Sequence, residues 1–373
     1  MPETLRILES LDAVDPARWD ALAGGNPTLA HAFLDSLHRS GCASPARGWS
    51  PRYLSLWKGP ELAGAVPLYE KTHSYGEYVF DWAWADAYER HGLDYYPKLL
   101  AAVPFTPATG PRLLAADDAT RRRLATALLA MARDAGMSSL HVLFPSADDA
   151  AALREAGLLE RSGVQFHWRN PGYASFDEFL AALSHDKRKK IRQERRRVAD
   201  AGVTLERLTG HEARAEHWDF LTACYRRTYR AHRSTPYLDR AFFGMIAERM
   251  PGQVLLVLAK REGRPIAAAL DLFGPHALYG RYWGSTEHVP GLHFEACYYQ
   301  AIEFCIERRI GLFEGGAQGE HKHARGFLPE PTCSFHWLAH PAFNRAIDEY
   351  LAREGAHIAA YVDELHERTP FRK

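Results

Sequence analysis

Long apolar runs, a net charge and a pattern of paired cysteines are all missing from this chain of 373 residues. No run approaches the roughly 20 apolar residues of a membrane-spanning helix, so we expect no membrane span. Lys plus Arg and Asp plus Glu are equal at 46 each, so no overall electric field draws the chain to DNA. The five cysteines are scattered without a Cys-x-x-Cys pair, which indicates buried thiols in a reducing cytoplasm: Cys42, Cys224, Cys297, Cys305 and Cys333.

Several catalytic and targeting motifs are absent as well. The first residues, Met1-Pro2-Glu3-Thr4-Leu5-Arg6, lack a basic region followed by an apolar one, so we expect no signal peptide and a cytoplasmic protein. The chain has no Gly-x-Ser-x-Gly and no His-Glu-x-x-His, which argues against a serine nucleophile and a metalloprotease-type site. A metal site at Glu320, His321 and His323 is an alternative, but His-x-His alone is weak evidence, and we predict no metal.

The composition that remains is that of a globular protein, with 46% apolar and 25% charged residues. The length allows two domains of ordinary size. The expected elements follow in the order strand, helices, hairpin, strand, helix, strand, helix, strand, which predicts an α/β fold with a mixed sheet flanked by helices. Strong elements include a helix over 120–136 and a hairpin over 253–273 that turns at Arg261-Glu262-Gly263-Arg264. The prolines over 97–107 argue against a central strand there, and we expect the chain to end with two helices, over 342–354 and 358–367.

The most informative stretch is a glycine-rich polar loop over 313–327, which follows a short apolar strand. Glycines let the backbone approach a ligand, and loops at strand ends are common binding sites in α/β proteins. Three of its side chains can accept a proton: Glu314, Glu320 and His321. Others can bind a ligand or hold an oxyanion through side-chain or backbone N–H groups: Gly315, Gly316, Gln318, Lys322 and Arg325. A solvated surface turn is the alternative interpretation.

The two halves of the chain are similar in order. Gly157-Leu158-Leu159 is followed ten positions later by His167, and Gly326-Phe327-Leu328 is followed at the same spacing by His336. Upstream of each we expect a hairpin, an aromatic strand, a helix and a short strand, with the aromatic strand of the first half within 78–88. This predicts a duplication into domains 1–170 and 171–373, with a cleft between them.

A helix over 186–201 is strongly basic. From Lys187 to Arg197 it carries eight Lys or Arg and one Glu, a net charge of +7. Mutual repulsion lowers helix stability, and a bound polyanion such as tRNA, a nucleotide-linked precursor or CoA relieves it. The predicted contacts are Lys187, Arg188, Lys190 and Arg192. The alternative is a solvated helix whose charges have acidic partners on neighbouring elements.

Two motifs resemble a known family. The stretch from Leu183 to Arg197 resembles the basic helix that opens the second domain of Fem-like peptidyl- and aminoacyl-transferases. Phe313-Glu314-Gly315-Gly316, followed by Lys322 and Phe327, resembles their Phe-Asp-x-Gly … Tyr-Lys-x-x-Phe segment. Glu314 replaces the usual Asp, and His321 stands where Tyr is usual. The order of elements resembles the GNAT acyltransferase fold used twice, and most specifically a bacterial group of predicted N-acyltransferases labelled peptidoglycan biosynthesis or recognition proteins.

The resemblance implies transfer of an acyl or aminoacyl group from an activated carrier to an amine, on a cell-wall precursor or a small metabolite. Enzymes of this fold that use CoA usually carry Arg/Gln-x-x-Gly-x-Gly/Ala to hold the pyrophosphate. The nearest string here, Arg281-Tyr282-Trp283-Gly284-Ser285-Thr286, fails at the last position. This weakens acyl-CoA and leaves aminoacyl-tRNA or another carrier open as co-substrate, with no tightly bound cofactor. A non-catalytic protein that recognises peptidoglycan precursors is the alternative.

Six further residues are predicted to line the cleft. They are polar or aromatic side chains near strand and helix ends in both halves: Asp81, Asp86, Arg281, Trp283, His293 and Glu295. The neighbouring aromatics Trp82, Trp84 and Tyr88 are more typical of packing than of ligand stacking.

Overall fold

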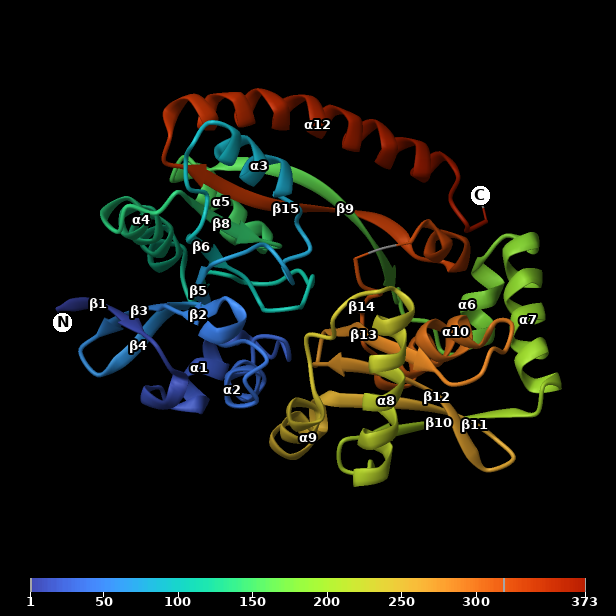
Figure 1. The fold of residues 1–373 in the computed structure, drawn as a ribbon. Helices are drawn as coiled ribbons and strands as arrows, with labels where there is room; N and C mark the ends of the chain where they lie inside the picture. The colour runs from blue at the N-terminus through green and yellow to red at the C-terminus, as the bar shows by residue number, and fades with distance from the viewer. Residues whose placement is uncertain (1, 318, 373) are drawn as a thin grey trace. The chain divides into compact units, whose positions relative to one another are not determined.

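The computed structural model describes residues 2–317 and 319–372 (Figure 1). The chain has the predicted mixed α/β fold and forms two compact units. Unit 1 consists of the residues up to Val164 and of Pro331–Val362, and unit 2 consists of Gln165–Glu330 and the residues from Asp363 onward. Each unit therefore includes a second stretch from the C-terminal part of the chain. The duplication into domains 1–170 and 171–373 stays a prediction, because compactness alone does not compare the two halves.

Unit 1 contains an antiparallel sheet and a group of mixed strands. The antiparallel sheet has the order β1 (Glu3–Leu8), β3 (Tyr53–Lys58), β4 (Glu61–Val66), β7 (Leu114–Ala115). The mixed group has the order β15 (Leu328–Leu338), β8 (Ser139–Leu143), β6 (Lys98–Ala101), β5 (Leu68–Lys71), β2 (Trp49–Pro51). Only the pair of β6 with β8 is parallel among these. The helices are α1 (Pro16–Ala23), α2 (His31–Arg39), α3 (Trp82–Arg90), α4 (Asp118–Asp134), α5 (Ala147–Glu155) and most of α12 (Pro341–Glu367).

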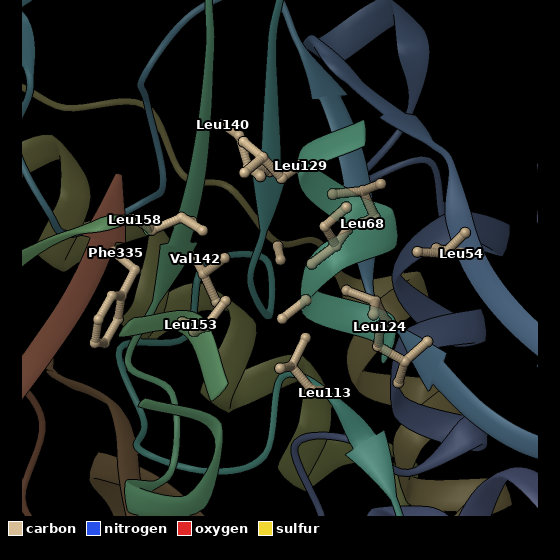
Figure 2. Close-up of a cluster of buried hydrophobic side chains, with 14 of the residues drawn as sticks. Leu54, Leu68, Leu113, Leu124, Leu129, Leu140, Val142, Leu153, Leu158 and Phe335 are labelled. Atoms are coloured by element: carbon tan, nitrogen blue, oxygen red, sulfur yellow. The ribbon is translucent and has the colours of Figure 1, made fainter. Parts of the chain in front are cut away.

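The core of unit 1 is built on the apolar side of α4. Asp117 caps this helix by accepting a hydrogen bond of 2.7 Å from the backbone N–H of Thr120. Leu124 and Leu128, one turn apart, are fully buried. They belong to a cluster with residues of β3, β5, β8 and β15, several of which are shown in Figure 2. Burial of each such leucine contributes about 1.5–3 kcal/mol to stability, so α4 is the element that holds these strands together.

Two predictions in unit 1 are wrong. The aromatic stretch within 78–88 contains helix α3 rather than a strand, because Trp84 and Tyr88, four residues apart, are both buried on one helical face. The prolines around 97–107 argued against a central strand, yet β6 lies between β5 and β8. Pro97 immediately precedes the first residue of β6, where a missing backbone N–H does not interrupt the ladder.

The C-terminal helix is longer than predicted. We expected two helices over 342–354 and 358–367, whereas α12 is continuous from Pro341 to Glu367. Gly355 lies inside it, and glycine in a helix interior costs about 1 kcal/mol. The neighbouring Glu354 accepts two hydrogen bonds of 2.8 Å from Arg161 of β9 (Leu159–Arg169), and Leu351 is buried. These contacts offset the glycine, so the helix continues.

Unit 2 is a sheet with helices. Its strands follow the order β10 (Val203–Thr209), β11 (Val254–Arg261), β12 (Arg264–Phe273), β13 (Ala277–Ser285), β14 (Leu312–Glu314) and the last residues of β9. All neighbours are antiparallel except β13 and β14, which are parallel. The helices are α6 (Phe176–Ala182), α7 (His185–Asp200), α8 (Ala215–Ala231), α9 (Arg240–Arg249), α10 (Leu292–Phe294) and α11 (Gln300–Arg308). A π-helical segment, Glu295–Tyr299, connects α10 to α11.

A tight hairpin turn and a close helix–strand contact are two local features that determine the structure of unit 2. The predicted hairpin of β11 and β12 is confirmed, with Arg261 opposite Arg264 and positive φ at Glu262 and Gly263, as the tightest hairpin turns require. At Gly284 of β13, helix α8 packs so closely that a Cβ atom would lie 2.3 Å from the carbonyl oxygen of Cys224. In the described part of the chain, no helix combines the length and apolar character needed to cross a membrane.

Candidate functional site

β13 and β14 part at their carboxyl ends. They pair over three residues, the last being Tyr279 and Glu314, after which β14 ends while β13 continues to Ser285. The chain then turns back across this opening. Gly316 has a φ of 84°, and a Cβ atom there would lie 3.6 Å from the carbonyl oxygen of Gly280. The opened carboxyl end of two parallel strands is a typical place for a ligand in α/β proteins.

Glu314 is a buried carboxyl group at this strand end, 3% exposed. It lies opposite His167 of β9 in the sheet, and its Oε2 is 3.9 Å from the imidazole Nε2. Burial lowers the pKa of His167 to about 3, and the charges of Arg169 and Lys322 act in the same direction. The imidazole is therefore neutral at physiological pH, so this contact joins a carboxyl group to a neutral ring and is no ion pair.

Lys322 brings an amine to the same strand end. It lies in a 3₁₀ turn, Glu320–Arg325, and its Nζ donates a hydrogen bond of 2.7 Å to the carbonyl oxygen of Gly316. Its side chain is 2% exposed, and burial lowers its pKa to about 8. Gly315 makes room for it, since a Cβ there would lie 3.2 Å from Cε of Lys322. A buried ammonium with a pKa near neutrality can hold a negative charge or exchange a proton.

Predicted residues from three segments meet in an aromatic cluster. His321 accepts or donates a hydrogen bond of 2.9 Å between its Nε2 and the hydroxyl of Tyr298. Its ring centroid lies 6.2 Å from that of His293, which lies 5.4 Å from that of Trp283. Burial lowers the pKa of His293 to about 4, assisted by the nearby cationic side chains and His321. His321, which also has a lowered pKa, is thus neutral at pH 7 and able to accept a proton.

Three other predicted residues are less informative. Gln318 lies outside the described residues. Glu320 is exposed at the start of the 3₁₀ turn. Arg281 rests on the ring of Tyr282, 5.1 Å from its centroid, and both belong to β13. All but the last residue of the string 281–286 therefore lie in strand β13.

Arg325 is held by protein groups. Its Nη2 and Nε donate hydrogen bonds to the two carboxyl oxygens of Glu194, at 2.6 and 3.2 Å. Its Nη1 donates one of 2.6 Å to the carbonyl oxygen of His321, and the guanidinium lies 3.3 Å from the ring centroid of Phe294. Tyr299 donates its hydroxyl hydrogen to the same Glu194 carboxylate. These contacts tie the turn that carries Lys322 to helix α7.

Glu295 is also paired. Both of its carboxyl oxygens accept hydrogen bonds from Arg195, at 3.0 and 3.1 Å, and Gln300 donates another of 2.8 Å. Arg195 reaches Glu303 as well, at 2.6 Å. Glu295 is only 4% exposed. Its pair with Arg195 therefore fixes the start of the π-helical segment against α7.

The basic helix has one buried and one open side. Ile191, Glu194 and Val198 face the protein. A pocket of about 520 Å³ lies along the open side, lined by Ala181, His185, Arg188, Lys189, Arg192, Gln193 and Arg196. Arg192 has one acidic neighbour, Asp177, at 3.7 Å. Of the four predicted contacts, Arg188 and Arg192 line this pocket, whereas Lys187 and Lys190 are not among its lining residues.

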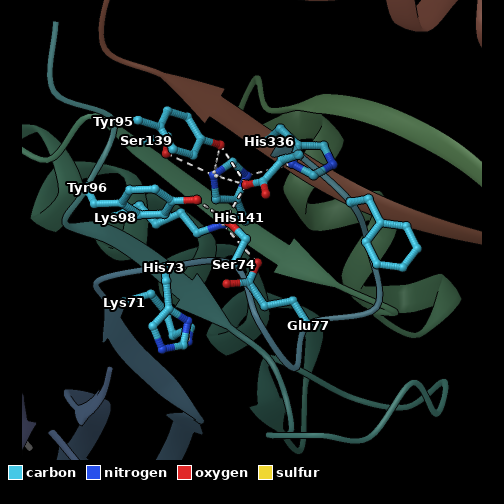
Figure 3. A network of polar contacts seen from close by, with 12 residues as sticks. Lys71, His73, Ser74, Glu77, Tyr95, Tyr96, Lys98, Ser139, His141 and His336 are labelled. Carbon is cyan, nitrogen blue, oxygen red and sulfur yellow. Dashed lines mark hydrogen bonds and ion pairs between the residues drawn. The ribbon is translucent and has the colours of Figure 1, made fainter. Parts of the chain in front are cut away.

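Asp81 of unit 1 belongs to a buried polar network, whose members Lys98, Glu77 and Ser74 are labelled in Figure 3. Lys98, fully buried, donates hydrogen bonds to Asp81 (2.5 Å), Glu77 (2.8 Å) and Ser74 (2.7 Å). Burial acts to raise the pKa of Asp81, but the Lys98 ammonium outweighs it and the net shift is downward. Burial raises the pKa of Glu77 to about 7. Asp86, by contrast, is exposed on α3.

Three residues of these networks were not among those predicted from the sequence. His167 served only as a landmark of the repeat, although it is the cross-strand partner of Glu314. Glu194 is the single acidic residue among the basic ones from Lys187 to Arg197, and that isolation was a usable signal. Lys98 follows Pro97 in a stretch that we did not expect to be a strand. Among residues 2–317 and 319–372, no group of three or more His, Cys, Asp or Glu side chains is placed to hold a metal ion.

Solved structures share this fold. FemX superposes with a TM-score of 0.58 at 13% identity, covering 93% of this chain and 100% of that one. L-PGS from Bacillus licheniformis superposes with a TM-score of 0.54 at 11% sequence identity, covering 90% of this chain and 97% of that one. The C-terminal domain of a putative lysylphosphatidylglycerol synthetase from Agrobacterium fabrum superposes with a TM-score of 0.51 at 12% sequence identity. It covers 76% of this chain and 85% of that one. At such identities the likeness concerns the fold alone.

Sequence comparison identifies the family. No curated protein sequence matches the chain. The FemAB-like family model, described as peptidoglycan biosynthesis/recognition, matches residues 10–373. This confirms the resemblance drawn from the basic helix and the glycine-rich loop. Because the match extends over nearly the whole chain, the protein belongs to the FemAB-like family.

Proposed function

We propose that the protein is an N-acyltransferase that moves an acyl or aminoacyl group from an activated carrier to an amine. The observation that carries this proposal is that Glu314 and Lys322 are both buried at the open carboxyl ends of β13 and β14. A carboxylate can accept a proton, and an ammonium 2% exposed can stabilise negative charge far better than it would in water. The family description supports a cell-wall precursor as the acceptor, with a small metabolite as the alternative.

The chemistry follows from these two groups. The acceptor amine loses a proton to the Glu314 carboxylate as its nitrogen attacks the acyl carbon. A carbon–nitrogen bond forms, and the oxygen of the acyl group becomes negative while Lys322 lies beside it. The bond from the acyl carbon to the carrier oxygen or sulfur then breaks, and the leaving group takes up a proton. Attack is direct, so no protein nucleophile is required. The alternative bases are Glu320 and His321. The alternative hydrogen-bond donors to the oxyanion are Arg325 and the backbone N–H groups of Gly315 and Gly316.

The carrier is inferred from where anions can bind. In unit 2 the helix that follows β13 begins after Gly291, and a Cβ atom there would lie 3.3 Å from the carbonyl oxygen of Glu194 in α7. The backbone of α7 therefore packs close to the start of this helix, where enzymes of this fold that use CoA hold its pyrophosphate. The basic pocket on α7 suits the phosphates of tRNA. We propose aminoacyl-tRNA over acyl-CoA as donor, acting as a co-substrate in the cytoplasm, with no tightly bound cofactor and no DNA partner.

The test is acyl transfer measured as a mass change of the acceptor. Candidate acceptors are amine-bearing peptidoglycan precursors, and donors are a set of aminoacyl-tRNAs and acyl-CoAs. Glu314→Gln and Lys322→Ala are each expected to lower turnover by about 10²–10⁴. Glu330→Gln is the matched control, because this half-exposed carboxylate pairs with Arg169 at the start of β15 and should leave turnover unchanged.

A non-catalytic recognition protein is the competing function. It predicts that precursor binds, by calorimetry, without any transfer from any donor, and that Glu314→Gln leaves this affinity unchanged. Transfer by the parent and its loss in Glu314→Gln with binding retained would decide for the enzyme.

A further inference from the structure

Helix α7 has two faces with different contacts. Its open face lines the basic pocket, whereas two consecutive residues, Glu194 and Arg195, contact the protein on the other side. Glu194 is 8% exposed and is the only acidic residue between Lys187 and Arg197. A carboxylate buried this far needs a charged partner, and that partner, Arg325, belongs to the loop that carries Lys322.

Glu194 reaches that loop through Arg325. The guanidinium and carboxylate form a two-pronged pair, with N–O distances of 2.6 and 3.2 Å, which is the geometrically most specific form of ion pair. Arg325 also donates to the carbonyl oxygen of His321, the residue before Lys322. Because Arg325 ends the 3₁₀ turn that contains Lys322, the pair determines where the backbone of this turn lies.

Arg195 makes the equivalent connection to the π-helical segment. It holds Glu295, the first residue of that segment, through both carboxyl oxygens. Tyr298 and Tyr299 lie in the same segment, and they bond to His321 and Glu194 respectively. Isolated π-helical turns occur often at functional sites. Two adjacent residues of α7 thus hold both segments that surround Lys322.

We propose that Glu194 is a positioning residue that couples occupation of the basic pocket to the placement of Lys322. This inference rests on the proposed function and names its regulation: the phosphates of the donor bind the open face of α7, and the Glu194–Arg325 pair transmits the position of α7 to the turn. The coupling is reciprocal, so any change that frees the turn also changes the affinity of the pocket for the donor.

Glu194→Gln removes the charge and keeps the shape of the side chain. A glutamine can accept one hydrogen bond from Arg325 but cannot form the two-pronged pair. In the full chain we expect kcat for acyl transfer to fall about tenfold or more, while KM for aminoacyl-tRNA changes by less, about threefold to fivefold, because the loss of coupling also alters the affinity of the pocket. Glu307→Gln is the control, since Glu307 lies on the neighbouring helix α11 but pairs with Arg207, away from α7 and the turn.

A second measurement is independent of turnover. The rate at which acetic anhydride modifies Lys322 is followed by peptide mass spectrometry with and without deacylated tRNA. In the parent and in Glu307→Gln, tRNA should change this rate about fivefold or more; in Glu194→Gln it should not, although tRNA still binds. If no donor supports transfer, the proposed function fails, and this labelling still tests the coupling. An equal response in Glu194→Gln and the parent, or no response in the parent, overturns the inference.

Discussion

Lys322 gives the sharpest prediction, because its burial has a calculable effect on stability. Lysine in water has a pKa of 10.5, and burial lowers that of Lys322 to about 8. Each pKa unit is equivalent to about 1.4 kcal/mol, so the charged form is disfavoured by about 3 kcal/mol in the folded state. Lys322→Met removes this penalty and also removes the hydrogen bond to the carbonyl oxygen of Gly316, a loss of about 1–3 kcal/mol. The two effects nearly cancel at pH 7.

The pH dependence of the free energy of unfolding distinguishes the penalty for the buried ammonium from the lost hydrogen bond. Below pH 8 both folded and unfolded Lys322 are protonated, so the parent bears the full penalty. Between pH 8 and 10.5 the unfolded chain binds more protons than the folded one, so the parent becomes more stable as pH rises. Above 10.5 both forms are neutral and the penalty is gone. Relative to Lys322→Met, the parent should therefore gain about 3 kcal/mol from pH 7 to pH 11.

The assay is urea-induced unfolding of parent and variant at half-unit steps across this range, with turnover measured on the same preparations. Lys260→Met is the control, because Lys260 is partly exposed and paired with Glu206, and its variant should show no such slope. A difference between parent and Lys322→Met that does not change with pH refutes the assignment of a lowered pKa. Full turnover by the variant refutes a catalytic role for the amine.

Three further predictions follow from the same contacts. His321→Ala should lower turnover in the acyl-transfer assay by about 10²-fold, because the neutral imidazole can accept a proton during the reaction. The midpoint of thermal unfolding should stay unchanged. Arg192→Glu should weaken tRNA binding and reduce its salt slope by about one to two, measured by filter binding at several salt concentrations. Arg264→Glu, in the β11–β12 turn outside the lining of the basic pocket, should not. Lys98→Met should destabilise the protein by about 3–5 kcal/mol in urea unfolding, because Asp81 is left as an uncompensated buried charge; an unchanged midpoint would contradict this.

Local signals in the sequence predicted most of the fold. The α4 and α7 helices and the β11–β12 hairpin each have strong periodicity or turn chemistry, and the structure confirms all three. The errors come from positions where tertiary contacts decide. Trp82 and Trp84 alternate as in a strand, yet burial at a spacing of four makes α3 a helix. β6 could not be predicted because its first residue, Lys98, is a charged side chain whose partners come from distant parts of unit 1.

The site was predicted unevenly for the same reason. The glycine-rich loop was visible because Gly315 and Gly316 precede a cluster of proton-accepting and cationic groups in sequence. The sequence could not show that Lys322 is buried against Gly315, nor that His167 lies opposite Glu314, because these contacts depend on strand pairing and on how the loop folds back.

Acyl transfer by Glu314→Gln, compared with the parent and with Glu330→Gln, tests the role of the buried carboxylate most directly. The parent and Glu330→Gln should transfer the acyl group at equal rates. Glu314→Gln should bind the same precursor with unchanged affinity and turn over about 10²–10⁴ times more slowly. Turnover by Glu314→Gln at the rate of the parent would contradict the central claim that this buried carboxylate removes the proton of the acceptor amine.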